Sequence, residues 1–597
     1  MKGAVKITFG VQPDGIEDRI QTTIAPGRVM SRALASASSA DRRLPMARAF
    51  AVRLVSRWWA TLASDQPIRP LLAPFAVEEL TPAVAALADS LGKEASFLDI
   101  ETAAYEIGLI YTGMLPTDHR SAHGIYYTPP ALTAHLIGLA HRAGVDWAGA
   151  RVLDPACGGG AFLTPIALTI RKALAHCDPR IVVENLGSRI HGYELDPFGA
   201  WLSQVTLDAA MLPVTRAAGT PLPVVVSVGD TLRRVPPRDK FDLVIGNPPY
   251  GRVKLDASDR KKFARSLYGH SNLYGLFTDM ALRHTKVGGV IAFVTPTSFL
   301  AGEYYKKLRG LLGDEAPPKS FDFVSVRKNV FDEVLQETLL ATYVRGSKVG
   351  KVTVAELQPV STNAIVLKAV GTFSLPQQTS EPWLLPREAA QASLVTRLAR
   401  MKGRLADWGY AVSTGPLVWN RHKDQLANRP GKDRHPLIWA ESITSDGRFE
   451  FRADRRGHAP YFQLRAADRS LITDRACVLL QRTTAKEQRR RLIAAAIPED
   501  FMRQHTVVVV ENHLNMVLPI GDGPKVDARV LAAFLNSTAA DRAFRCVSGS
   551  VAVSAYELEA MPIPYVGDLS VLTELIQQGA TRQAIDLACL ELYGLNT

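Results

Sequence analysis

Residues 241–250 read Phe-Asp-Leu-Val-Ile-Gly-Asn-Pro-Pro-Tyr, and this stretch decides the fold. A short apolar run bounded by Gly and Pro is typical of a buried strand in a parallel sheet, and ligands bind where such strands end. The two prolines remove two N–H donors and stiffen the turn, which therefore presents carbonyl oxygens. The acceptors of Asn247 and Pro248, beside the flat ring of Tyr250, suit a planar amino group. The alternative is an ordinary Pro-rich turn, although chance gives such a tetrapeptide in only about a percent of chains this long.

The sequence around this stretch has the pattern of a parallel sheet. Short apolar runs alternate with helix-compatible stretches, which predicts βαβ units in an α/β fold. The last two runs are too close together for a helical crossover, so an antiparallel edge hairpin is expected there. The seven runs are 151–153, 190–193, 224–228, 241–245, 290–294, 321–326 and 339–344.

Composition changes along the chain predict three regions. Residues 1–120 are rich in Ala, Leu and Arg, with helical spacing in 46–63 and 82–91, and are expected to be helical. The α/β pattern occupies 121–375, and a boundary is expected between 346 and 388, where Gly, Ser, Pro and Gln separate weak strands. Residues 376–597 mix strands with irregular Arg-rich segments, which predicts a mixed α+β domain with a helical tail from 569 to 592.

Composition limits the class of protein. The chain has 597 residues, 47% of them hydrophobic and 21% charged, which is ordinary for a globular protein with several domains. Its net charge of +12 favours a polyanionic partner. The five cysteines show no paired spacing, so neither disulfides nor a metal site is expected. No apolar stretch is long enough to span a bilayer and no signal peptide is evident, so we expect a soluble, cytoplasmic protein without a membrane partner.

A glycine turn follows the first predicted strand. Residues 151–162 read Arg-Val-Leu-Asp-Pro-Ala-Cys-Gly-Gly-Gly-Ala-Phe, a strand leading through three glycines into a helix. Glycines let the backbone approach a ligand closely. However, this is not the Gly-x-Gly-x-x-Gly pattern, and Asp154 precedes the glycines. Because a carboxylate disfavours a pyrophosphate, the turn favours the cationic S-adenosyl-L-methionine over NAD.

The next two strands also end in acids. Glu194 is placed to accept hydrogen bonds from ribose hydroxyls, and Asp230, followed by Thr231, to lie near an adenine amino group. Each acid alone is at least as often a helix cap or turn residue. Acids closing three consecutive strands are harder to explain structurally. Upstream, the Tyr-Thr-Pro-Pro turn at 127–130 could close the pocket, or could simply begin a helix.

The order of these motifs resembles that of the γ-class N6-adenine DNA methyltransferases, the TaqI-type restriction–modification methylases. Two further stretches are similar, Asn-Leu-Tyr-Gly-Leu-Phe at 272–277 and Gly-Gly-Val-Ile-Ala-Phe-Val-Thr-Pro at 288–296. The resemblance is specific over 121–345, fainter to about 565, and absent from 1–100. It implies a Rossmann-like, seven-stranded S-adenosylmethionine-dependent catalytic domain in 121–375 and a DNA target recognition domain in 376–597.

The resemblance also implies roles for individual residues. Asn247 and Pro248 would bind the amino group of a flipped-out adenine, Tyr250 would stack on it, and Phe331 would close the base pocket from the other side. Contacts with S-adenosylmethionine, and none with a metal, are implied for Thr128, Asp154, Ala156, Gly158, Glu194, Leu195, Asp230, Thr231, Pro249 and Phe277.

The segment 481–491, Gln-Arg-Thr-Thr-Ala-Lys-Glu-Gln-Arg-Arg-Arg, is the candidate for contacts with DNA. Gln and Arg make bidentate contacts with base edges, and the resemblance favours DNA here. For 489–491 a solvated charge run is an equally good interpretation. Residues 435–439 and 533–537 resemble parts of the recognition domain. The predicted contacts are Gln481, Arg482, Thr483 and Lys486.

Together these features predict a site-specific, adenine-specific DNA methyltransferase that acts on duplex DNA by base flipping. Its partners would be double-stranded DNA and a cognate restriction endonuclease or other defence-system subunits. Hydrogen bonds to Asn247 and Pro248 would localise the amino lone pair, with no obligatory general base. The alternatives are a methyltransferase acting on RNA adenine or protein glutamine, and a non-catalytic DNA-binding component of a defence complex.

Overall fold

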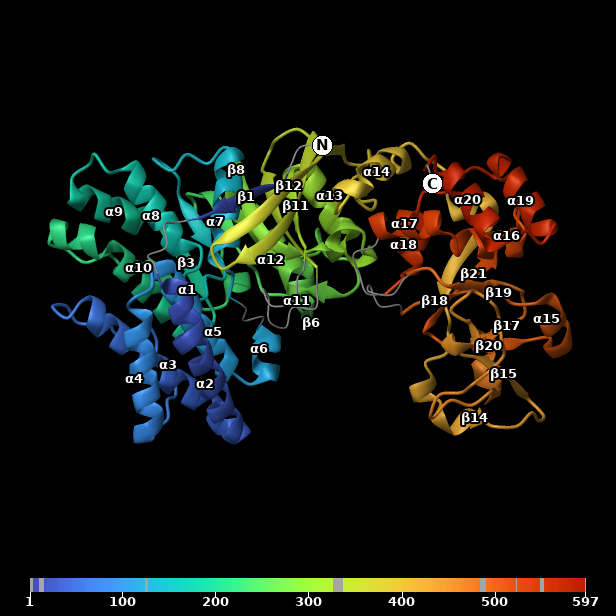
Figure 1. Cartoon of the computed structure of the whole chain (residues 1–597), viewed down its shortest axis with the longest axis horizontal. Coiled ribbons are helices and arrows are strands. Elements are labelled where there is room, and N and C mark those ends of the chain that lie inside the picture. The colour runs from blue at the N-terminus through green and yellow to red at the C-terminus, as the bar shows by residue number, and fades with distance from the viewer. Residues whose placement is uncertain are drawn as a thin grey trace. The chain divides into compact units, whose positions relative to one another are not determined.

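The computed structural model describes residues 4–9, 15–123, 127–325, 337–483, 490–521, 523–547 and 552–595, without the side chains of 121–123 (Figure 1). The chain forms two compact units. The first unit comprises Met1–Pro296 and Gly310–Ser374, and the second comprises Thr297–Arg309 and Leu375–Thr597. The change of unit after Ser374 lies beside the boundary expected at 375/376.

The first unit is built on a ten-stranded mixed sheet in the order β1-β12-β11-β9-β10-β8-β5-β2-β3-β4. Strands β4, β3, β2, β5 and β8 are parallel, and β10 runs antiparallel to both β8 and β9. The strands are β1 (Val5–Thr8), β2 (Val152–Asp154), β3 (Ile190–Glu194), β4 (Val226–Val228), β5 (Phe241–Gly246), β8 (Thr285–Pro296), β9 (Pro318–Val324), β10 (Thr338–Val344), β11 (Lys351–Ser361) and β12 (Ala364–Ser374). A separate ribbon joins β6 (Arg252–Val253) to β7 (Ser271–Asn272).

Each of the seven predicted runs falls on a strand, but the sheet is wider than the predicted seven strands. The β9–β10 hairpin is antiparallel as expected. It does not lie at the edge, because β11 pairs in parallel with β9, β12 pairs with β11, and β1 pairs with β12 (Figure 1). In β11 the side chains of Val352, Val354 and Leu357 are buried, so these strands extend the core rather than forming a weak linker.

Helices cover the sheet. In the first unit α7 and α12 pack against β8, and α8, α9 and α10 pack against β3. The helices are α1 (Ile16–Arg19), α2 (Ala25–Ala37), α3 (Ala40–Leu62), α4 (Pro82–Ala95), α5 (Ile100–Met114), α6 (Thr117–His123), α7 (Pro130–Arg142), α8 (Leu163–Ala173), α9 (Pro179–Arg189), α10 (Pro197–Ala218), α11 (Ala257–Lys262), α12 (Leu273–His284) and α13 (Lys306–Glu315).

The N-terminal region is helical as predicted, but it shares its core with the α/β part. Buried side chains of α3, α4 and α5 pack with Phe198, Trp201 and Leu202 of α10 in one apolar cluster. Arg69, after α3, donates to the Asp208 carboxylate from Nε at 2.5 Å and from Nη2 at 3.0 Å. Residues 4–9 and 15–120 therefore lie in the same compact unit as the sheet.

The second unit contains two small sheets and a group of helices. A four-stranded sheet has the order β13-β21-β18-β19, and a five-stranded sheet the order β14-β16-β15-β20-β17. The helical tail is present, divided at Gly579 with φ +65°. The strands are β13 (Tyr410–Thr414), β14 (Leu426–Ala427), β15 (Arg434–Ile438), β16 (Tyr461–Gln463), β17 (Ile472–Thr473), β18 (Val478–Gln481), β19 (Ala494–Ala496), β20 (Val508–Val510) and β21 (Leu514–Pro519). The helices are α14 (Ala392–Leu398), α15 (Glu499–His505), α16 (Ala528–Leu535), α17 (Thr538–Val547), α18 (Ala555–Ala560), α19 (Ser570–Gln577) and α20 (Arg582–Leu592).

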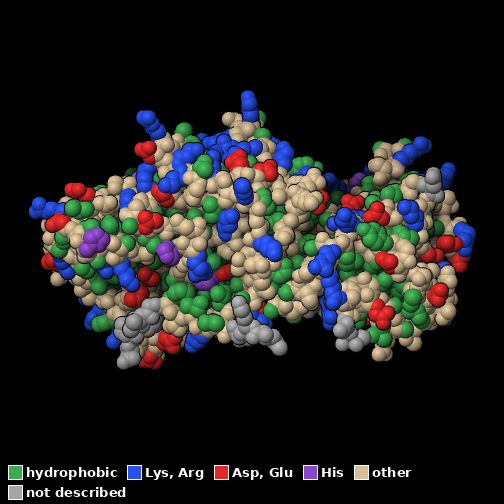
Figure 2. Space-filling view, turned by 90° about the horizontal axis from the view of Figure 1, so that it is seen from above, with side chains coloured by type: hydrophobic (Ala, Val, Ile, Leu, Met, Phe, Trp, Pro, Cys, Tyr) green, Lys and Arg blue, Asp and Glu red, His purple; other side chains and the backbone are tan. Residues whose placement is uncertain are grey.

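The surface is rich in basic side chains. Lys and Arg side chains gather on the face shown in Figure 2, in keeping with 70 basic and 58 acidic residues in the chain. Within the ranges that the structure describes, no helix is both long and apolar enough to cross a bilayer.

Candidate active site

A cavity of about 460 Å³ opens where β2, β3, β4 and β5 end. This volume lies within the range of small-molecule sites, roughly 300–1,000 Å³. The carboxyl ends of neighbouring parallel strands meet at one sheet edge, which is why motifs spread over more than 100 residues converge here. Ten of the predicted site residues line the cavity: Thr128, Ala156, Gly158, Glu194, Leu195, Asp230, Thr231, Asn247, Pro249 and Phe277.

The glycine turn forms one wall of the cavity. Gly158 and Gly160 have φ values of +50° and +89°, in the region that favours glycine. A Cβ at Gly159 would lie 2.6 Å from Cε1 of Tyr127 and 2.9 Å from Cδ2 of Leu202. Any larger residue at Gly159 would therefore displace the turn from its packing against Tyr127 and α10.

Glu194 ends β3 with its carboxylate fixed by backbone donors. Its Oε2 accepts from the Gly158 N–H at 2.8 Å and its Oε1 from the Asp196 N–H at 2.9 Å. Burial raises the pKa of Glu194, and these two N–H groups oppose that rise. A carboxylate has about four acceptor positions, so acceptor capacity remains for hydroxyl groups of a ligand.

Asp154 lies beneath the turn rather than in the cavity wall. It is buried, and its Oδ1 accepts from the Ala156 N–H at 3.1 Å. A Cβ on Gly246, at the end of β5, would lie only 2.7 Å from this oxygen, so the carboxyl group needs glycine there. Burial raises the pKa of Asp154 to about 8; the Ala156 N–H opposes this rise and the charge of Glu194 adds to it.

The end of β4 is tied to the end of β2. The Thr231 hydroxyl donates to the Pro155 carbonyl at 2.7 Å. Asp230 caps the short 3₁₀ helix Thr231–Arg233, accepting from the Leu232 N–H at 2.9 Å. Asp230 is exposed, so it combines the capping role with a place on the cavity rim.

The Asn-Pro-Pro-Tyr turn follows β5. Nδ2 of Asn247 donates to the Thr128 hydroxyl at 3.1 Å, and the Tyr250 hydroxyl donates to Oδ1 of Asn247 at 2.6 Å. Burial raises the pKa of Tyr250, and its ring meets that of Tyr274 edge to face with centroids 6.2 Å apart. The oxygen predicted to accept from an amino group thus already accepts from the Tyr250 hydroxyl, and one of its two lone pairs remains for a substrate.

The structure does not place the other two predicted catalytic residues in the cavity wall. Pro248 is buried behind Asn247 and does not line the cavity. Phe331 lies outside the described residues.

The N-terminal helices contact residues that line this cavity, which the sequence did not predict. Asp196 lines the cavity; its Oδ1 accepts from Nη2 of Arg48 on α3 at 2.8 Å, and its Oδ2 from the Tyr111 hydroxyl on α5 at 2.9 Å. A Cβ at Gly108 of α5 would lie 2.3 Å from the ring of Tyr127, which also lines the cavity. Tyr127 stands inside a motif already noted and Asp196 follows Glu194 by two residues, but no local signal points to Arg48 or Tyr111.

The predicted DNA contacts lie in the second unit, and two of them make hydrogen bonds within the protein. Nε2 of Gln481 donates to the carbonyls of Ala440 at 3.1 Å and Ile443 at 3.0 Å, so this amide nitrogen supports the fold. Arg482 donates to the Asn512 carbonyl at 3.2 Å. Thr483 is exposed, and Lys486 lies outside the described residues.

The Arg-rich run at 489–491 does not behave as a solvated charge run where it is described. Arg490 donates to the carbonyls of Asn536 at 2.7 Å and Ser445 at 2.8 Å. Arg491 is 3% exposed, and its backbone N–H donates to Asp541. The local charge pattern could not show this, because the partners lie about 45 residues away in the sequence.

The fold and the cavity define the class of protein. Within the ten strands, β4-β3-β2-β5-β8-β10-β9 form a seven-stranded sheet whose single antiparallel strand is next to last. A glycine turn and strand-end acids lie at its carboxyl edge. This is the fold of the S-adenosylmethionine-dependent methyltransferases.

Comparison with known proteins narrows the class. Residues 230–331 match the model of the Eco57I restriction-modification methylase family. The chain is 26% identical over 331 residues to the type II methyltransferase M.BsuBI of Bacillus subtilis, covering 55% of this chain and 66% of the relative. It is 25% identical over 350 residues to M.PstI of Providencia stuartii, covering 58% and 69%. The resemblance to restriction–modification methylases is therefore confirmed, with the chain spanning about two thirds of these relatives.

The solved structure of the type IIL restriction-modification enzyme MmeI, determined in complex with DNA, has a similar fold. The alignment covers 98% of this chain and 97% of that chain, with a TM-score of 0.53 and 12% identity. At this identity the likeness concerns the fold alone.

Proposed function

We propose that this protein is a site-specific DNA methyltransferase that methylates N6 of a flipped-out adenine in duplex DNA, as the modification arm of a restriction–modification or defence system. One observation carries the proposal: Asn247 lies in the wall of the same cavity as Glu194 and the glycine turn. The cavity would thus combine a place for a cofactor with an acceptor for an amino group. The restriction–modification methylases similar to this chain support the substrate class.

The residues present fit S-adenosyl-L-methionine. Glu194 would accept hydrogen bonds from the ribose hydroxyls, and Asp230 from the adenine amino group of the cofactor. Leu195 and Phe277 would flank the adenine of the cofactor. The glycine turn would pass along the amino-acid part, with Asp154 beneath it. When bound, S-adenosylmethionine supplies an electrophilic methyl group on a sulfonium.

The role of the Asn-Pro-Pro-Tyr turn is to hold the target nitrogen. An adenine amino group is a poor nucleophile because its lone pair is delocalised into the ring. The Asn247 Oδ1 and the Pro248 carbonyl would accept hydrogen bonds from its two N–H groups. These bonds would localise the lone pair and direct it toward the methyl group. Tyr250 would release Asn247 and stack on the base, which helps to offset the few kcal/mol that base flipping costs.

Duplex DNA is the partner that the charge of the protein favours. Basic side chains release counterions from phosphates, so a net charge of +12 supports binding to a polyanion. We assign sequence recognition to the second unit, where Arg482 and Thr483 remain the candidate contacts. A cognate restriction endonuclease would be a further partner.

The test is to identify the methylated atom. Purified protein and labelled S-adenosylmethionine are incubated in three separate reactions, with unmethylated duplex DNA, with RNA or with a protein extract. The DNA is then digested to nucleosides. We expect label in N6-methyladenine from duplex DNA, placed at a defined sequence. Label in RNA or in protein glutamine would move the function to one of those alternatives, and DNA binding without transfer would favour a non-catalytic component.

A further inference from the structure

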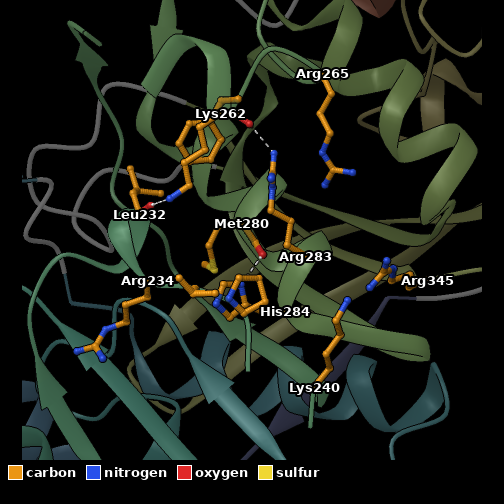
Figure 3. A pocket seen from close by; sticks show the side chains of 12 residues that line it. Leu232, Arg234, Lys240, Lys262, Arg265, Met280, Arg283, His284 and Arg345 are labelled. Carbon is orange, nitrogen blue, oxygen red and sulfur yellow. Dashed lines mark hydrogen bonds between the residues drawn. The ribbon is translucent and has the colours of Figure 1, made fainter. Parts of the chain in front are cut away.

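A second cavity of the first unit is strongly basic. It has a volume of about 340 Å³ and is lined by residues of four segments: the loop before β5, the region of α11, helix α12 and the residue after β10 (Figure 3). No Asp or Glu is among the described residues that line it. Its six cationic side chains are Arg234, Lys240, Lys262, Arg265, Arg283 and Arg345.

Most of this charge is not neutralised by carboxylates. Arg265 and Arg283 share the buried Asp279, at 2.5 and 3.0 Å, and Arg265 also pairs with Glu315 at 2.7 Å. The other four cations have no carboxylate partner among the described residues. Lys262 donates to the Leu232 carbonyl, Arg345 to Thr285 and Arg234 to Val228. Carbonyls satisfy N–H groups without cancelling charge, so an excess of positive charge remains in a concave site.

His284 adds an unsatisfied polar atom to the same cavity. It is 1% exposed and lines the cavity, and its Nδ1 bonds to the Met280 carbonyl at 2.9 Å. Nε2 is buried and has no hydrogen-bond partner among the residues that the structure describes. Buried polar atoms are nearly always paired, so an unpaired ring nitrogen on a residue that lines this cavity indicates a missing ligand. Nε2 can accept from the hydroxyl of a protonated phosphate, or donate to an oxyanion once protonated.

The position of this cavity separates it from the candidate active site. Lys240 directly precedes β5, and His284 directly precedes β8, whereas Asn247 follows β5. Because β5 has six residues, its two ends are about 17–20 Å apart. The two cavities share only Leu232 and Phe263 as wall residues.

We propose that this cavity binds a phosphate-bearing anion, separately from the cofactor and the target base. Clustered Arg and Lys donors, an unpaired imidazole nitrogen and no acid among the described lining residues are the features of a phosphate site. The phosphate could belong to a free polyphosphate or to a DNA strand, and the experiment distinguishes these sources. Only the DNA source rests on the proposed function.

The first arm uses inorganic pyrophosphate, titrated calorimetrically into the intact protein. The test variant is Lys240→Gln with Arg345→Gln, which removes two charges from the cavity without touching the residues assigned to cofactor or base. The control is Lys351→Gln with Lys368→Gln, which removes two charges from exposed positions on β11 and β12. We expect the test variant to bind pyrophosphate at least tenfold more weakly and the control to stay within twofold of wild type. Thermal unfolding of both variants verifies that they fold.

The second arm measures duplex DNA binding as a function of salt. If a DNA phosphate occupies the cavity, the slope of log K against log salt becomes shallower by about one to two in the test variant, and not in the control. If the occupant is a free anion, only pyrophosphate binding falls. Either result supports the site. Equal pyrophosphate binding and equal salt slopes in test and control variants would overturn it, whether or not the protein methylates DNA.

Discussion

The two regions that build the candidate active site do so in different ways. The strand ends of the sheet reach the cavity directly, with Glu194 after β3 and Asn247 after β5. Helices α3 and α5 reach it through Asp196, which receives hydrogen bonds from Arg48 and Tyr111. The first region carries groups that can touch ligands, and the second holds one of those groups in place.

This difference shows why a helical region without recognisable motifs belongs to the site. Asp196 also caps α10, accepting from the Gly199 N–H at 3.3 Å. Its two oxygens are therefore shared between the start of a helix and two side chains from α3 and α5. We expect substitutions at the strand ends to have larger effects than substitutions in these helices.

The largest effect is expected for Asn247→Ala. Loss of the oxygen that would hold the amino group should lower kcat by about 10²–10³-fold, the usual cost of removing one preorganised polar group. Affinity for S-adenosylmethionine should change little, because Asn247 is only part of a wall that ten predicted residues share. Single-turnover methyl transfer and calorimetric titration of the cofactor separate the two quantities. An equal loss in both would place Asn247 in cofactor binding instead.

A smaller effect, on stability, is expected for Asp154→Asn. The pKa of Asp154 is raised to about 8 in the folded protein, from 3.8. Between these values the folded state holds a proton that the unfolded state lacks, so the group lowers stability as pH rises toward 8. From pH 5 to 7 the wild type should lose about 3 kcal/mol relative to Asp154→Asn.

Urea unfolding of both proteins at several pH values measures this difference. The exposed Asp239→Asn variant is the matched control and should follow wild type at each pH. A constant difference between wild type and Asp154→Asn would show that this carboxyl group does not titrate as described.

Glu194→Gln should weaken the cofactor rather than the chemistry. The Gln side chain has one oxygen in place of two, so it can keep only one of the two hydrogen bonds from the Gly158 and Asp196 N–H groups. The side chain would therefore reorient. We expect affinity for S-adenosylmethionine to fall about tenfold, or roughly 1.4 kcal/mol. Glu184→Gln, on the exposed side of α9, is the control and should bind like wild type. Equal affinities for both variants would remove Glu194 from the cofactor site.

The smallest effect is expected in the helices. Arg48→Gln leaves Asp196 with Tyr111 as a partner, so affinity for the cofactor should fall only about threefold, or roughly 0.7 kcal/mol. Arg53→Gln, on the same helix as Arg48, breaks an exposed pair with Asp89 of α4 and should leave affinity unchanged. A tenfold or greater loss in Arg48→Gln would mean that the helices matter as much as the strand ends.

The strand ends could be predicted from the sequence, and the contacts made by the helices could not. The strands and the cavity residues follow from local patterns, because an apolar run and the polar residue after it are adjacent in the chain. No local pattern specifies that β11 pairs with the hairpin, β12 with β11 and β1 with β12, because these partners are set by long-range contacts. Arg48 and Asp196 are 148 residues apart, and Gln481 reaches the Ala440 carbonyl across 41, so neither contact could be predicted from composition or spacing.

The central claim, that α3 acts on the cavity through Asp196, is tested most directly by a double-mutant cycle. Calorimetric titration gives the affinity for S-adenosylmethionine of wild type, Arg48→Gln, Asp196→Asn and the double variant. If Arg48 works through Asp196, the double variant should bind as weakly as Asp196→Asn alone and no more weakly, because coupled residues are not additive. Losses that multiply would contradict the claim and show that Arg48 supports the site by another route.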